Sequence, residues 1–182
     1  MILVIRFIGI LNASIWLGAA VFFTFFAAPA FFSGDIKSFG LHPFWPGAMA
    51  QLVIARFFQL QYICGALALA HLFAEWVYLG RTLHRLTLGL LLGLFFAGLA
   101  GGLWLQPKLK ELHLTKYSMG PDYKPVPMAD ALRIQAAQSF GRWHAAYSIV
   151  NLIALGGLVF YLWRVTHPSD NLRFVGAPKF RS

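Results

Sequence analysis

Four long apolar runs alternate with polar segments and fill about half of this chain. The runs lie at about 7–32, 57–79, 86–105 and 144–163, and Glu75 is the one formal charge within them. A helix needs about 20 apolar residues to cross a bilayer core about 30 Å thick. The pattern therefore predicts an all-α fold, an integral membrane four-transmembrane-helix bundle, and a single membrane domain over residues 1–182.

The second and fourth predicted helices extend beyond the bilayer. Pro46 suits the first turn of a helix, and nothing breaks the pattern from there to Gly80. A second long helix is expected to start near Met128 and to run into the fourth apolar run. Between the third run and this helix, the polar and turn-rich stretch 108–127 predicts a loop that contains His113.

Small residues mark close packing in the third run. Gly89, Gly93, Ala97 and Gly101 recur every four residues, and such a stripe lets another backbone approach. We expect the partner to be a neighbouring helix, with Gly93 against it; a homo-oligomer seam is the alternative. Cys64, the single cysteine, is expected to be a small packing residue.

The charge distribution bears on partners and orientation. The net charge of +9 comes from Lys and Arg that flank the apolar runs, which indicates contact with membrane lipids and no nucleic acid. Seven basic residues lie on the side of the termini and eight on the side of the two longer loops. The short Arg81–Arg85 connection weighs more than a long loop, so the termini are predicted to be cytoplasmic, in the cell (inner) membrane.

Two clusters of polar residues lie within the predicted spans, where polar groups are costly and are functional candidates. Near the terminal side are Asn12, His71 and Glu75, of which the last two share a helix face and could carry a proton, bind a cation or simply pair. Near the loop side are His144, Tyr147, Ser148 and Asn151, with Gln59 and Gln106 at similar depth.

The loop-side residues follow helical spacing at i, i+3, i+4 and i+7, so they form one polar face that either joins helices or lines a small recess. His71 and His144 should lie roughly 20 Å apart along the bundle, too far to ligate one ion. Haem held by a single histidine stays open. The sequence has no nucleophile elbow, no phosphate-binding glycine loop and no metalloprotease helix, which favours a protein that is not an enzyme.

Three stretches resemble the transmembrane protein 205-like family, a four-span membrane domain of unknown function in the copper-resistance D-like superfamily. They are residues 7–32, Ala55–Tyr62 and Ser139–Leu152, the last with His144 and Asn151 where that family has His and Asn. The resemblance implies the four-span fold. It also raises the prospect of metal or haem association, because the superfamily includes a haem-pathway membrane oxidase.

Three functions follow as hypotheses. The first is binding or passage of a small solute or metal complex through a polar recess at Gln59, His144, Tyr147, Ser148 and Asn151. The second is a haem-associated membrane redox protein that uses His71 or His144. The third is a structural or assembly subunit without a site.

Overall fold

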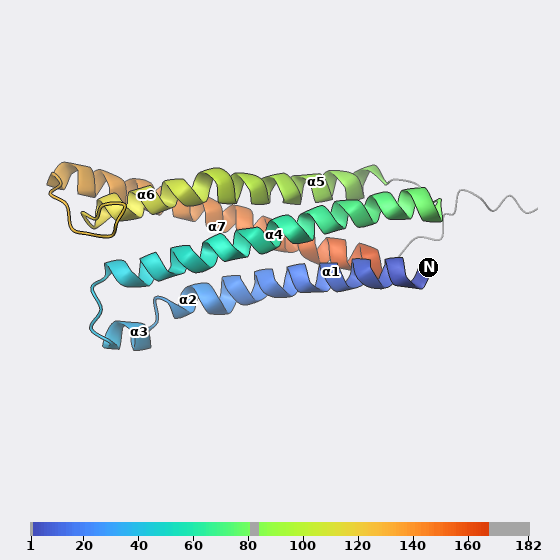
Figure 1. Cartoon of the computed structure of the whole chain (residues 1–182), viewed down its shortest axis with the longest axis horizontal. Coiled ribbons are helices and arrows are strands. Elements are labelled where there is room, and N and C mark those ends of the chain that lie inside the picture. The colour runs from blue at the N-terminus through green and yellow to red at the C-terminus, as the bar shows by residue number, and fades with distance from the viewer. Residues whose placement is uncertain (1, 81–83, 168–182) are drawn as a thin grey trace, which may run out of the picture.

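A computed structural model describes residues 2–80 and 84–167, which fold into long helices joined by short connections (Figure 1). Four of these helices are long and apolar enough to cross a membrane, as the sequence predicts. The first comprises α1 (Ile2–Phe22), a π-helical turn η1 (Phe23–Ala27) and α2 (Ala28–Ala30), and the short α3 (Gly34–Ser38) follows it. The others are α4 (Phe44–Leu79), then α5 (Arg85–Ala100) with the π-helical turn η2 (Gly101–Leu105) and α6 (Gln106–Lys116), and finally α7 (Asp130–Thr166).

α4 and α7 are much longer than a bilayer core is thick. α4 has 36 residues and α7 has 37, so each is about 55 Å long, against about 30 Å for the core. Both therefore extend beyond the bilayer on the side of the longer connections, which we call the loop side. α4 begins at Phe44, slightly before the predicted start, and α7 begins at Asp130, slightly after it.

The third helix is also extended, and here the predicted loop is wrong. Residues 106–116 form α6 and place His113 on a helix. The apolar run ends at Leu105, but Leu, Lys and Glu are good helix formers, and a helix outside the bilayer needs no apolar surface. The predicted break does appear further on, where the Gly120 N–H donates to the Lys124 carbonyl at 2.8 Å.

The four helices form a ring in which each packs against its neighbours. α1 lies against α4 and α7, α4 against α5, and α6 against α7 (Figure 1). Trp16, Leu91 and Tyr161 are almost completely buried at its centre. Cys64 is also buried and forms part of this core, as expected for a small packing residue.

The outside of the bundle is apolar. Only 17% to 28% of the most apolar stretch of each long helix is buried within the chain, and large side chains such as Leu3, Phe96 and Ile153 face outward. In water such a surface would associate, whereas a bilayer covers it. The protein is thus a multi-pass membrane protein.

The expected position of Gly93 against a neighbouring helix of this chain is wrong. A side chain added at Gly89 or Gly93 would meet nothing within 4 Å, whereas one at Gly101 would collide with Phe58. Steps of four residues advance about 40° beyond a full turn, so Gly89 and Gly101 point about 120° apart on a straight helix. The homo-oligomer seam through this face stays a prediction.

Candidate functional site

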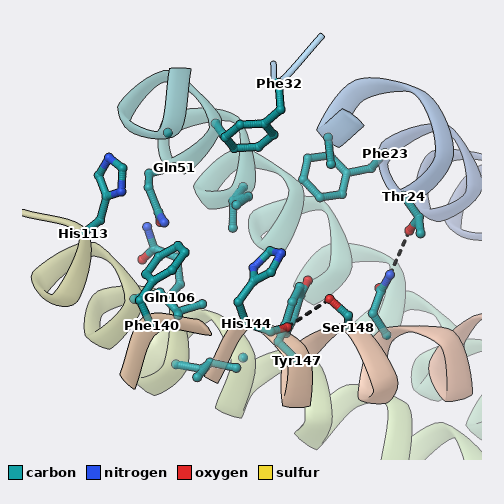
Figure 2. Close-up of a pocket in the computed structure, with 18 of the residues that line it drawn as sticks. Phe23, Thr24, Phe32, Gln51, Gln106, His113, Phe140, His144, Tyr147 and Ser148 are labelled. Carbon is teal, nitrogen blue, oxygen red and sulfur yellow. Dashed lines mark hydrogen bonds between the residues drawn. The ribbon is translucent and has the colours of Figure 1, made fainter. Parts of the chain in front are cut away.

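A recess of about 470 Å³ opens at the loop side of the bundle, between the end of the first helix, the start of α4, the η2–α6 segment and the start of α7 (Figure 2). Its walls are mostly apolar, with Phe23, Phe58 and Phe140 among them. Polar side chains stand at a few points on these walls. A volume of this size, with apolar walls and a few polar groups, is typical of small-molecule sites.

The predicted polar face of α7 lies along this recess. His144, Tyr147, Ser148 and Asn151 all line it, and Figure 2 shows the first three extending from α7 towards the space beneath Phe32. At about 100° per residue the four positions fall within one 100° sector of the helix, so they point the same way. The Ser148 hydroxyl donates to the His144 carbonyl at 2.9 Å. The His144 ring itself stacks on Phe140.

A hydrogen bond closes the inner end of the recess. The Asn151 amide donates to the Thr24 hydroxyl at 2.8 Å and joins α7 to the π-helical turn of the first helix (Figure 2). Thr24 was not singled out from the sequence, because a lone threonine in an apolar run has no signal of its own. This part of the polar face therefore joins helices, while the part nearer the loops lines open space.

Two glutamines face the same recess from other helices. Gln51 of α4 and Gln106 of α6 both line it, whereas Gln59 is not among the lining residues and instead accepts a 3.0 Å hydrogen bond from Arg56. Gln51 is not among the site residues that the sequence predicts. Gln51 is a single amide within an apolar stretch. Such a residue can be recognised as part of a site only when the helix that faces it is known.

Two polar atoms on these walls have no partner. The Gln51 Oε1 atom and the Tyr147 hydroxyl are buried, and neither has a hydrogen-bond partner within the part of the chain that the structure describes. Gln51 as a whole is only 8% exposed. Leaving a buried polar group unpaired costs about 1–3 kcal/mol, and both atoms belong to side chains that line the recess, where a bound molecule could offer them a hydrogen bond.

An aromatic cluster, here called the aromatic lock, lies at the outer end of the recess, where His113 and Tyr117 are among the lining residues. It consists of Phe44, His113, Tyr117 and Tyr123. The His113 ring stacks on Phe44 with centroids 5.2 Å apart, and its Nε2–H donates to the Phe44 carbonyl at 3.1 Å. Gly47 lies directly against the same ring, where a side chain would not fit. The lock fixes the end of α6 to the start of α4.

Both π-helical turns border the recess. Phe23 and Thr24 come from η1, and Gly101 and Leu105 come from η2. A π-helical turn is rare and is frequently found at functional sites. Two such turns at one recess indicate that the backbone is shaped locally to form its wall.

The terminal-side cluster is organised differently. The His71 Nε2–H donates to the Ile5 carbonyl at 2.9 Å, and the Asn12 amide donates to the Cys64 carbonyl at 2.9 Å. Both bonds join α1 to α4, and the His71 ring lies against Gly9. Glu75 is half-buried one turn further along α4. These contacts fit the role of holding two helices together.

Residues suited to a metal do not gather in the described ranges: no group of three or more His, Cys, Asp or Glu side chains lies close enough together there to hold an ion. His71 lies between α1 and α4, whereas His144 lies on the recess.

Comparison with known proteins gives one match. Residues 11–118 match a family model whose description is a domain of unknown function, DUF4149. No curated protein and no solved structure matches the chain. The matched range includes Gln51, Gln106 and His113 of the recess and ends before α7.

Proposed function

We propose a function for this chain from the premise that it belongs to the DUF4149 family, to which no activity is assigned: it is a multi-pass membrane protein that binds a small solute in the loop-side recess. The relation to the transmembrane protein 205-like family remains part of this proposal. Of the stretches that carry it, Ser139–Leu152 lies beyond the matched residues and contains His144 and Asn151.

The observation that carries the proposal is the pair of unpartnered atoms on the recess wall. The Gln51 Oε1 atom accepts and the Tyr147 hydroxyl can donate or accept, so a solute with two polar groups, one of them a donor, could pair with both. Its remaining atoms would contact apolar walls. Binding would then relieve two buried polar groups and cover apolar surface, the combination expected of a ligand site.

The side of the membrane on which the recess opens depends on the orientation of the protein in the bilayer. We propose that the termini lie in the cytoplasm. The basic Arg81–Arg85 connection supports this orientation, because short basic loops are retained on the cytoplasmic side. The recess would then open on the opposite side of the inner membrane. Reporter fusions at Ser182 and within the stretch 116–124 test it, and an external signal at Ser182 would reverse the assignment.

The binding proposal is tested by filling the recess. Ser148→Trp places a bulky side chain on its wall, and Ile149→Trp places the same side chain at an exposed position of α7 that is not among the lining residues. Small molecules extracted from each purified variant and from the unmodified protein are compared by mass spectrometry.

We expect at least one molecule that is present in the unmodified protein and in Ile149→Trp and is lost from Ser148→Trp. Identical extracts from all three would refute binding in the recess. A haem absorbance band that disappears with His144→Ala would favour the redox alternative instead.

A further inference from the structure

We infer that the occupant of the recess is a single-chain amphiphile with an anionic head group, which enters sideways from the bilayer and places its head beside Lys116. This inference rests on the proposed function and specifies its ligand class. Three features of the recess carry it: its length, its lateral opening, and an unpaired cation at its outer end.

The recess is long and follows the membrane normal. On α7 its lining extends from Phe140 to Leu152, which is about 18 Å of helix. Leu152 lies about 10 Å inside the apolar part of α7, whereas Lys116 follows the end of the apolar run at Leu105 by about 16 Å. One end of the recess therefore lies at the depth of acyl chains and the other lies beyond the apolar core.

The recess is open along its side. Its lining includes exposed residues from two sides: Pro29 of α2 with Phe32 in the turn that follows it, and Ser148 with Leu152 on α7. Phe32 is 55% exposed and Leu152 is 54% exposed, and Leu152 lies within the membrane-spanning part of α7. Lipid thus borders this opening directly, and a chain already in the bilayer can enter without passing through water.

The inner walls are mostly apolar. Phe23, Phe58 and Leu152 line the inner half, where Asn151 and Thr24 are paired with each other. A hydrocarbon chain can therefore lie there without breaking a hydrogen bond. The Tyr147 ring packs on Phe58, and its unpartnered hydroxyl offers a contact to a polar atom of the ligand.

The outer end carries an unpaired positive charge. Lys116 is half-buried, its Nζ lies 5.0 Å from the centre of the Tyr117 ring and 5.8 Å from that of Phe140, and no carboxylate pairs with it in the described ranges. Three other loop-side cations do have such partners, for example Lys108 with Glu111 at 3.0 Å, but none of the three lines the recess. A half-buried ammonium beside an apolar recess is suited to an anionic group.

A neighbouring lysine gives a matched control. Lys110 lies on the same helix, its Nζ is 5.4 Å from the centre of the Tyr123 ring, and it does not line the recess. Lys116→Gln and Lys110→Gln therefore remove the same charge from similar aromatic settings. Both variants should melt at the temperature of the unmodified protein, which is the check that each is folded.

The experiment measures binding to the detergent-solubilised protein by native mass spectrometry with four probes: palmitate, palmitoyl lysophosphatidate, palmitoyl lysophosphatidylcholine and inorganic phosphate. We expect the two anionic amphiphiles to bind more tightly than the zwitterionic one. Lys116→Gln should weaken the anionic amphiphiles about threefold to fivefold, as for a partly exposed ion pair. Lys110→Gln should leave all affinities unchanged, and Ser148→Trp should abolish binding of all three amphiphiles.

Other outcomes separate this inference from the proposed function. If the amphiphiles bind equally, are lost in Ser148→Trp and ignore Lys116→Gln, the recess binds a solute but the anionic head is refuted. If inorganic phosphate binds as tightly as the amphiphiles, the acyl chain is refuted. If Ser148→Trp binds all probes as the unmodified protein does, the recess is not the site, and both ideas fail.

Discussion

The packing of η2 against α4 predicts a loss of stability whose magnitude can be estimated from interatomic distances. A Cβ added at Gly102 would lie 2.9 Å from the Cβ and Cγ atoms of Phe58 and would also collide with the Tyr62 hydroxyl. Carbon atoms pack best at about 3.5–4.0 Å, and the Cβ of Phe58 cannot swing away because it is fixed to the backbone. Gly102→Ala should therefore force α4 and η2 apart, at a cost of about 1–3 kcal/mol.

Gly93→Ala is the matched control, because a Cβ there meets nothing within 4 Å. Both variants gain roughly 0.5–1 kcal/mol from the lower backbone entropy of alanine, so this term cancels in their difference. The assay is reversible unfolding in mixed micelles by a denaturing detergent, followed by circular dichroism. We expect Gly102→Ala to be less stable than Gly93→Ala by the overpacking term alone, and a difference below about 0.5 kcal/mol would refute the close approach.

Three further predictions concern the recess. A double-mutant cycle with Thr24→Val and Asn151→Leu should give a coupling of about 0.6 kcal/mol in the same unfolding assay, as for hydrogen bonds between membrane helices. His113→Ala should lower stability by about 1–3 kcal/mol, since it removes one hydrogen bond and one aromatic stack of the lock. Ser148→Cys should react with a water-soluble maleimide, whereas the buried Cys64 should not.

Each of these predictions has an outcome that contradicts it. Additive effects in the double-mutant cycle would mean that the bond is not formed in the membrane. His144→Ala is the control for His113→Ala, because His144 is exposed on the recess wall. Equal losses of stability in the two variants would show that the aromatic lock does not stabilise the fold. An unreactive Ser148→Cys would mean that water does not reach the recess.

The sequence predicts those features that depend on one helix at a time. The four spans and the extensions of α4 and α7 follow from lengths of apolar and helix-compatible residues. The common direction of His144 and Asn151 follows from helical spacing, because seven residues complete nearly two turns. Glycines spaced four residues apart do not stay on one face, because each step rotates them by about 40° around the helix. They therefore do not all face the same neighbouring helix.

Features that depend on two helices are not accessible in the same way. Depth along the spans predicts Gln106 near His144, and both line the recess. Nothing in the local sequence indicates that Gln51 joins them, or that Arg56 donates a hydrogen bond to Gln59. α6 was missed because the end of an apolar run was interpreted as the end of a helix. Outside the bilayer these two boundaries are independent, since helix propensity and not hydropathy decides where such a helix ends.

The π-helical turn η1 has a consequence for how this chain tolerates changes in length. A π turn contains one residue more than the α-helical turn it replaces, so every position after it is rotated by about 100° relative to an uninterrupted helix. Removal of one residue within the turn, for example the lipid-facing Phe25, would restore an ordinary helix and leave Pro29 and Phe32 pointing towards the recess, because the deletion shifts each later position by that same 100°. A single-codon deletion within η1 should thus preserve both the binding wall and a helix that spans the membrane.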